Sequence, residues 1–353
     1  MKPHSRYCNN TGMTLVELLV AMVIGMILLG GVYTVYIGSI RTYSMNHQLN
    51  RVQENLLFTK DLLTRDIRVA GYSGCAGGDV DNFLSDQSYA YDFSNAVSGY
   101  DAGTDIDGNP VWNPNLPNET GSPLNHNPTP GSDILVIRSV LPDGIPVVTN
   151  MPPQAATFFI PAGTSGIAQG DILMVADCNN SSAAIFQVSN YNLNGGAGNV
   201  VHNTGGAVNP GNDAHSFDYG IGAELMHVRT ITYFVRSVDA DGNSTEPTLY
   251  RRIGTADPEP LVEGVETMQV LYGEDTIDND RAADIYVTPE AVTDWNNVVS
   301  VRIGLLLRSP EELMHGTIDD RTYNVNGTNI TAPGDRRLRV VVNTTIGLRN
   351  RLP

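Results

Sequence analysis

Residues 12–25 of the chain read GMTLVELLVAMVIG, a glycine followed by an apolar run that carries one acid, Glu17, near its start. A short leader with Lys2 and Arg6 precedes the glycine, and residues 18–40 contain no charged side chain. A bilayer core of about 30 Å needs about 20 apolar helical residues, so this run is long enough to cross a membrane. A carboxylate at that depth costs roughly 2.5–3.5 kcal/mol on insertion scales, so we expect Glu17 to have a partner and a function.

The pattern resembles the processing site of type IV prepilins, which combines a basic leader, a glycine, a hydrophobic residue, Thr or Ser, two aliphatic residues, Glu and an apolar run. The resemblance implies that a prepilin peptidase cuts between Gly12 and Met13 and that Met13 becomes N-methylated. It also implies a role for Glu17 in subunit assembly, in which its carboxylate pairs with the N-terminus of a neighbouring subunit. Met13 stands where the family more often has Phe. An ordinary signal anchor or signal peptide is the alternative, but a secretory signal is cut after its apolar core, whereas this cut precedes the core.

The helical pattern continues beyond the apolar run as an amphipathic stripe. Apolar residues recur at steps of three and four or their sums, between charged and amide residues; they are Met45, Leu49, Val52, Leu56, Leu63 and Ile67. Gly71 and the glycines after it end the pattern. A helix over residues 13–70 would be about 85 Å long at 1.5 Å per residue, which is long for a globular domain.

We therefore expect four parts: a leader peptide (1–12), the transmembrane half of a spine helix (13–40), its amphipathic half (41–70) and an extracytoplasmic β-rich head (71–353). The basic leader places the N-terminus in the cytoplasm. The head would then lie in the periplasm, with the chain crossing the bacterial inner membrane once.

The composition and motifs of the 353-residue chain argue against two classes of function, nucleic-acid binding and catalysis. Its net charge is −17, and Lys2 and Lys60 are its only lysines. Direct non-specific nucleic-acid binding needs basic side chains near phosphates, so we expect none. There is no G-x-x-x-x-G-K-S/T loop, H-E-x-x-H helix or G-x-S-x-G turn in the sequence. We expect neither an enzyme nor a cofactor, although a triad assembled in space leaves no sequence motif.

The head is expected to be antiparallel sheet, which makes the fold class α+β. Runs rich in β-branched and aromatic residues predict strands; they cover residues 133–141, 157–160, 171–176, 184–191, 225–235, 247–253, 265–272, 298–307 and 338–348. The turn at residues 239–243 predicts a hairpin. Residues 71–131 and 192–215 are rich in Gly, Asn, Ser and Pro and predict long irregular loops.

The C-terminal half resembles PilW-type minor pilins and J-type pseudopilins. The segment LVEGVETMQVLYG (261–273) is followed by an acidic loop (274–284) and then by Trp295, which leads into a strand. The runs at residues 71–75 and 170–178 are also similar to PilW sequences. The large size, long loops and cysteine pair favour the minor pilin over the smaller pseudopilin. The resemblance implies a pilin-like fold, with a spine helix packed on a sheet.

Cysteine usage fits the expected compartment. Cys8 lies in the leader, so Cys75 and Cys178 remain in the processed chain. In an oxidising periplasm we expect these two to form one disulfide that ties the helix end to the sheet, rather than two free buried thiols.

The acidic loop offers one candidate metal site. Asp275, Asp278, Asp280 and Asp284 lie within ten positions, and calcium favours clustered carboxylates on a turn. The D-x-D-x-D-G pattern and its closing Glu are absent, however, so we expect a solvated acidic loop instead.

The resemblance implies a minor pilin that helps to prime type IV pilus assembly at the inner membrane and then resides at the pilus tip on the cell surface. Its partners would be other minor pilins, the major pilin, the prepilin peptidase, the inner-membrane assembly platform and a tip adhesin. Twitching motility, adhesion or DNA uptake would depend on it indirectly. Two alternatives stay open: a J-type pseudopilin of a type II secretion tip, and a membrane-anchored surface-binding module that uses residues 71–131.

Overall fold

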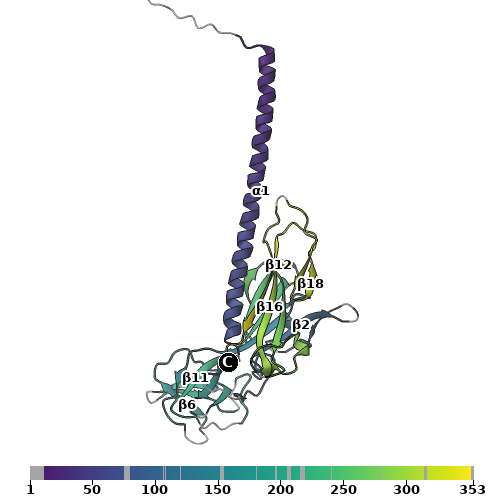
Figure 1. Ribbon diagram of the computed structural model, residues 1–353. Helices are drawn as coiled ribbons and strands as arrows, with labels where there is room; N and C mark the ends of the chain where they lie inside the picture. The colour runs from purple at the N-terminus through teal and green to yellow at the C-terminus, as the bar shows by residue number, and fades with distance from the viewer. Residues whose placement is uncertain are drawn as a thin grey trace, which may run out of the picture.

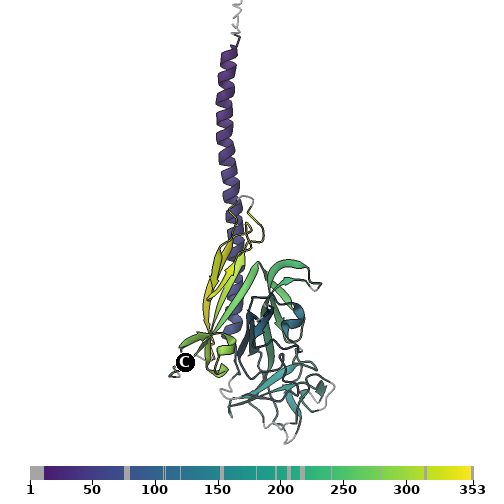
Figure 2. The same ribbon diagram turned by 90° about the vertical axis from the view of Figure 1, so that its right-hand side faces the viewer.

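The computed structural model describes residues 12–74, 80–105, 107, 109–119, 121–151, 155–179, 181–194, 197–204, 208–214, 219–239, 241–278, 280–313 and 316–350. One long helix, α1 (Leu15–Arg68), carries a head of strands and loops at its C-terminal end. The first half of α1 projects away from the head, and its second half lies along it (Figure 1). A second view, turned by 90°, shows the same separation (Figure 2).

α1 has 54 residues, which corresponds to about 80 Å at 1.5 Å per residue. Its buried residues occur only in the second half and at helical spacing; they are Gln48, Val52, Thr59, Leu63, Asp66 and Ile67. The chain leaves the helix through Gly71, whose φ of +66° lies in the left-handed region that favours glycine. The observed helix is two residues shorter at each end than the expected 13–70.

A four-stranded antiparallel sheet packs on the second half of α1. Its strand order is β15-β14-β16-β19, and its strands are β14 (Val265–Glu274), β15 (Ile285–Val287), β16 (Val298–Arg308) and β19 (Arg339–Gly347). Val52, Leu63 and Ile67 of the helix share one core with buried residues of β14, β16 and β19. A hairpin of β17 (Thr322–Val325) and β18 (Thr328–Thr331) also contacts this sheet.

A ten-stranded sheet forms most of the rest of the head. Its strand order is β1-β8-β7-β11-β4-β2-β3, with β5 and β12 also paired to β11, and β13 paired to β12. The strands are β1 (Val80–Asn82), β2 (Val97–Thr104), β3 (Pro110–Asn113), β4 (Ile134–Val140), β5 (Ile145–Pro146), β7 (Ile172–Asp177), β8 (Ser182–Gln187), β11 (Ala223–Val238), β12 (Ser244–Ile253) and β13 (Glu259–Glu263). Among the described strands of this sheet, only β1 and β8 pair in parallel.

Smaller elements complete the described part of the head. A three-stranded antiparallel sheet has the order β6-β10-β9, with β6 (Thr157–Pro161), β9 (Asn190–Asn194) and β10 (Ala197–Val201). Three short 3-10 helices are η1 (Pro123–His126), η2 (Pro289–Ala291) and η3 (Trp295–Asn297).

The long strand β11 divides the head into two lobes. Residues 223–227 pair with β7, whereas residues 228–233 pair with β4, and residues from 231 onward pair with β12. We call β1, β5–β10 and the first part of β11 the distal lobe. The proximal lobe comprises α1 from Gln48 onward, β2–β4, β12–β19 and the rest of β11. The distal lobe lies beyond the C-terminal end of α1 in both views (Figures 1 and 2).

The fold class α+β is confirmed, and each expected strand overlaps an observed one. Both regions expected to be irregular were interpreted wrongly. Residues 71–131 contain β1, β2 and β3, and residues 192–215 contain β10 and part of β9. These segments have weak strand propensity, but β2 pairs with β4, and β10 pairs with β6 and β9. Pairing to formed neighbours therefore outweighs local propensity here.

Candidate assembly site along the spine helix

The first half of α1 presents an apolar surface that no other described segment covers. Met13, Leu15, Val16 and the apolar residues that follow as far as Tyr36 are all at least half exposed. By length and composition, α1 is a helix that could cross a membrane. A soluble helix would bury such residues against a core, so this half needs an apolar environment from outside the chain.

Glu17 and Thr14 together form the N-terminal cap of α1. The Glu17 carboxylate accepts hydrogen bonds from Thr14 N (3.0 Å) and Thr14 Oγ1 (3.0 Å), while Glu17 N donates to Thr14 Oγ1 (3.3 Å). This reciprocal arrangement is a capping box. Gly12 and Met13 precede it with exposed side-chain positions. The structure therefore places the predicted cleavage and methylation residues just before the N-terminal end of α1, within five residues of Glu17.

The second half of α1 is fixed to the head by a buried carboxylate that the sequence analysis did not single out. Asp66 is 1% exposed, and Tyr233 Oη of β11 donates a 2.6 Å hydrogen bond to it. The guanidinium groups of Arg229 and Arg251 lie 3.9 Å and 3.8 Å from the same carboxylate. Burial, together with Asp66, raises the pKa of Tyr233, so its hydroxyl remains a donor. The sequence did contain a signal for a buried carboxylate, because Asp66 follows Leu63 by three residues and so lies on the apolar stripe of the helix.

Two hydrogen bonds to backbone carbonyls secure the end of α1. Arg349 N donates to the Arg68 carbonyl (3.2 Å), and Asn350 Nδ2 donates to the Ala70 carbonyl (3.2 Å). These bonds satisfy carbonyl groups that a helix leaves unpaired at its C-terminus. The segment after β19 therefore closes the helix end.

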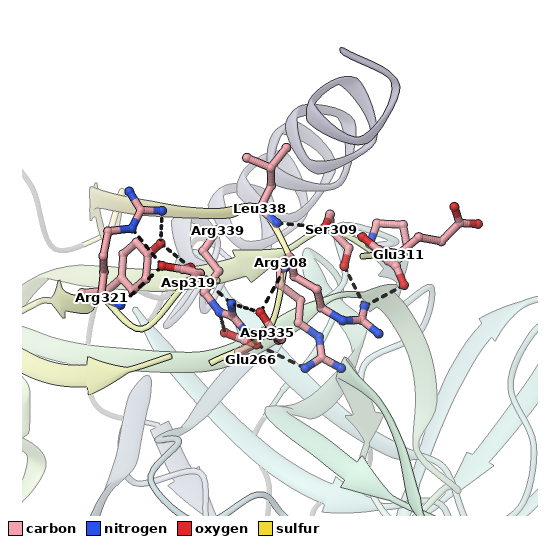
Figure 3. A network of polar contacts seen from close by, with 12 residues as sticks. Glu266, Arg308, Ser309, Glu311, Asp319, Arg321, Asp335, Leu338 and Arg339 are labelled. Atoms are coloured by element: carbon pink, nitrogen blue, oxygen red, sulfur yellow. Dashed lines mark hydrogen bonds and ion pairs between the residues drawn. The ribbon is translucent and has the colours of Figure 1, made fainter. Parts of the chain in front are cut away.

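A buried charge network lies on the proximal lobe at the start of β19 (Figure 3). The Arg339 side chain is fully buried. Its guanidinium contacts Glu266 (2.7 and 2.8 Å), Asp335 (2.6 and 2.7 Å) and Asp319 (3.3 Å). Paired forks of this kind are the strong form of the arginine–carboxylate contact. Although burial works against ionisation, hydrogen bonds from Arg321, Tyr323 and Arg339 lower the pKa of Asp319 to about 2.

The network extends towards the helix through Arg308 and Arg337. Arg308 binds Glu246 with two hydrogen bonds of 2.9 Å and Glu266 with one of 3.2 Å. Arg337 Nη1 donates to the carbonyls of Ser309 (2.7 Å) and Pro310 (2.6 Å). The adjacent Glu311 accepts a 3.2 Å hydrogen bond from buried Gln48 of α1. These charges fix the loop against which the helix first meets the head.

The structure brings together three of the four predicted metal-ligand candidates. Ligand atoms of Asp275, Asp278 and Asp284 lie within 4.8 Å of one another, and Asp280 is outside this group. Asp284 accepts hydrogen bonds from Thr276 N (2.8 Å) and Ile277 N (3.0 Å), and Asp275 accepts one from Arg281 N (2.7 Å). These carboxylates already shape the loop, and their proximity alone does not assign a metal.

Cys178 follows β7 and is disulfide-bonded. Its predicted partner, Cys75, lies outside the described residues, as does Cys8. The pairing of Cys75 with Cys178 therefore stays a prediction.

Two known protein families match segments near the two ends of the chain. Residues 8–33 match the prokaryotic N-terminal methylation motif, and residues 232–350 match the family described as type IV pilus-assembly protein W, PilW. The C-terminal third of the chain is thus similar to PilW, and its N-terminus carries a methylation motif. The PilW match falls on the proximal lobe, whereas the distal lobe lies outside it. No curated protein matches the chain.

Among solved structures, the chain is similar to a type IV-like pilin from Thermus thermophilus. The two share 13% sequence identity, and the superposition covers 86% of this chain and 98% of the other, with a TM-score of 0.32. That score is too low to support an argument about shared detail.

Proposed function

We propose that this chain is a minor pilin that helps to prime type IV pilus assembly at the inner membrane and then forms part of the pilus tip complex. Motility, adhesion or DNA uptake would depend on it through the filament. The observation that carries this proposal is the division of α1, whose first half is apolar and bare while its second half is packed on the head. A bilayer before assembly, and the apolar helices of other pilins afterwards, would each cover the bare half.

Processing is the first step of the proposed path. A prepilin peptidase would cut between Gly12 and Met13, and Met13 would become the methylated N-terminus. The new amino group would then lie four residues from Glu17. In an apolar environment Glu17 needs a cationic or hydrogen-bonding partner, and the amino terminus of a neighbouring subunit would supply one.

The processing step is tested by mass spectrometry of chain purified from membranes. We expect a mature mass that begins at Met13 with one added methyl group, and accumulation of the full-length chain for Gly12→Val. A wild-type chain that retains residues 1–12, or that is cut after residue 40, would contradict it.

The assembly step is tested with Glu17→Ala, together with Glu54→Ala as a matched control. Glu54 is an exposed acid on the same helix, beyond the apolar half. We expect Glu17→Ala to enter the membrane normally but to reduce both the number of surface pili and the recovery of other minor pilins with the chain. The control should leave both unchanged. Equal piliation and equal recovery for wild type and Glu17→Ala would remove the assembly role.

The same pull-down separates the pilus from a secretion pseudopilus. Recovery of pilus minor pilins supports our proposal, whereas recovery of type II secretion pseudopilins alone would assign the chain to a secretion tip. If neither group is recovered, a membrane-anchored surface-binding module becomes the better interpretation.

A further inference from the structure

We propose that the outer edge of β19 accepts an extended strand of a sister pilin, a different chain from this one, which adds to the four-stranded sheet by β-augmentation. The proposal rests on the proposed function, because it requires sister pilins in the same membrane. β19 is the last strand of the order β15-β14-β16-β19, so only its inner edge is paired among the described residues.

The hydrogen-bond register shows which residues face outward. Just before β19, Leu338 accepts a hydrogen bond from Ser309 N (2.8 Å), and just after it Leu348 N donates to Val299 (2.9 Å). Both pairs follow the same register as the nine pairs between β16 and β19. Because hydrogen-bonded pairs alternate in an antiparallel ladder, even-numbered residues of β19 bond inward. The backbone groups of Val341, Asn343 and Thr345 therefore point to the outer edge.

These outward backbone groups have no partner within the described residues. No hydrogen bond joins N–H or C=O of Val341, Asn343 or Thr345 to the described part of the chain, and β19 pairs with β16 alone. Asn343 and Thr345 are exposed, and Val341 is half-buried. Beyond the end of β19, the outward amide of Arg349 donates to the Arg68 carbonyl of α1, so the unpaired edge ends there. A short open ladder remains, about the length that one added strand would cover.

Several other edge strands in the described part of the head carry the devices by which proteins block such pairing, and β19 lacks them. β1, β3, β5 and β15 have two to four residues, and β3 contains Pro110. β13 combines Glu259, Pro260 and Glu263 with a register shift against β12. β19 has nine residues without Pro, Lys, acid or register shift. Its one charged residue, Arg339, is buried in the charge network.

The direction of α1 argues against a second copy as the occupant. Gln48 contacts Glu311 near the start of β19, and Arg68 contacts Arg349 just after its end. α1 and β19 therefore run in the same direction. Antiparallel pairing of two β19 strands would point the two apolar helix halves in opposite directions, so both could not enter one membrane. Parallel pairing would align the helices but would bring together two chains of net charge −17.

The test uses the full chain co-expressed with the other pilins of the same cell and purified from membranes in detergent. Residue-resolved hydrogen–deuterium exchange is measured on the chain alone and on the complex. We expect the amides of Asn343 and Thr345 to slow by at least about tenfold in the complex. The amides of Val342 and Thr344, which already bond to β16, serve as the internal control and should change little.

Two edge variants complete the test. Val341→Pro removes an outward N–H while leaving the inward ladder intact, and Asn343→Lys adds the charge that blocks edge pairing. Asn343→Thr is the control, because it keeps a β-forming residue. We expect both edge variants to reduce recovery of one sister pilin by about tenfold, with wild-type recovery for the control.

The outcomes separate this proposal from the proposed function. Recovery of sister pilins by wild type and by both edge variants alike would overturn the edge proposal alone. Slowed exchange at Asn343 in the chain alone, increasing with its concentration, would assign the edge to a second copy and also overturn it. A wild-type chain that recovers no sister pilin would overturn the proposed function, and the edge proposal with it.

Discussion

The two lobes of the head bury their polar groups in different ways. The proximal lobe buries charges: Arg339 is surrounded by three carboxylates, and Asp66 of α1 by arginines of β11 and β12. In the distal lobe, the side chain of Asn212 bonds the backbone of Gln187: Gln187 N donates to Asn212 Oδ1 (2.7 Å), and Asn212 Nδ2 donates to the Gln187 carbonyl (2.8 Å). An apolar core with Phe158 and Phe186 lies beside them.

The helix is attached to the lobe that buries charges, and the other lobe is held by different contacts. Arginine–carboxylate forks demand one geometry, so they fix the strands on which α1 lies in a single arrangement. The PilW match covers this lobe from residue 232 onward. Amide contacts and an apolar core hold this part of the distal lobe. We therefore expect variants in the two lobes to fail in different ways.

The largest effect is expected from Arg339→Ala. It leaves Glu266, Asp319 and Asp335 without their shared cation, and breaking a buried ion pair costs about 3–5 kcal/mol. Arg321→Ala is the matched control, because Arg321 also pairs with Asp319 but its side chain is 67% exposed. The control should cost less than about 1 kcal/mol. Urea unfolding in detergent measures both. A similar loss for the two variants would show that burial of the network contributes little.

Loss of the disulfide should destabilise the distal lobe, in which Cys178 follows β7. Cys178→Ser is expected to destabilise the chain by about 2–5 kcal/mol, because the bridge no longer restricts the unfolded state. If Cys75 is the partner, Cys75→Ser and the double variant should have the same effect as Cys178→Ser. Thiol labelling of denatured, unreduced mature chain should find no free thiol. Additive effects, or two labelled cysteines, would disprove this pairing.

Asp66→Ala should have an intermediate effect located where the helix meets the head. It removes the acceptor of the Tyr233 hydroxyl and the counter-charge of Arg229 and Arg251. An orphaned buried donor costs about 1–3 kcal/mol. Tyr233→Phe in the same background should restore part of the loss, because it removes the orphaned hydroxyl. No coupling between the two substitutions in a double-mutant cycle would contradict the role of this hydrogen bond.

The smallest effect is a pH dependence of the proximal lobe. The pKa of Asp319 is lowered to about 2, below the value of about 3.9 for an unfolded Asp. Its contribution is therefore present above pH 4 and is lost as the pH falls towards 2, by about 1–2 kcal/mol after allowance for screening.

The pH effect is measured as the difference in unfolding free energy between wild type and Asp319→Asn. Taking this difference cancels the contribution of Asp133, whose burial raises its pKa to about 8. Asp133 acts with the opposite sign, since its contribution falls as the pH rises from about 4 to 8. A difference that is constant between pH 5 and pH 2 would show that Asp319 is not held ionised by the network.

Much of this fold could be predicted because its strongest signals are local. The apolar run and the stripe after it specify α1, and β16 and β19 are dense in β-branched residues. β2 and β10 could not be predicted in this way. The sequence VSGYDAGT of β2 contains two glycines and an Asp, and it becomes a strand because β4 and β3 pair with its two halves.

The residues of the candidate site also differ in whether their sequence signals are local. Gly12, Met13 and Glu17 are adjacent in sequence and form a motif. The partners of Arg339 lie 4, 20 and 73 residues away. No local pattern specifies which of several arginines will be buried among carboxylates brought together by three separate segments. The position of Asp66 on the apolar stripe was the one sequence signal for a buried charge.

β11 also determines how the molecule would carry mechanical load. Its 16 residues pass from the distal lobe into the proximal lobe as one strand, and Tyr233 near its middle bonds Asp66 of α1. A pull between the distal lobe and the membrane end of α1 would follow a continuous backbone that is paired to one or two neighbouring strands along its length. The two lobes would thus resist tension as one body, because a paired strand stretches much less than a free linker.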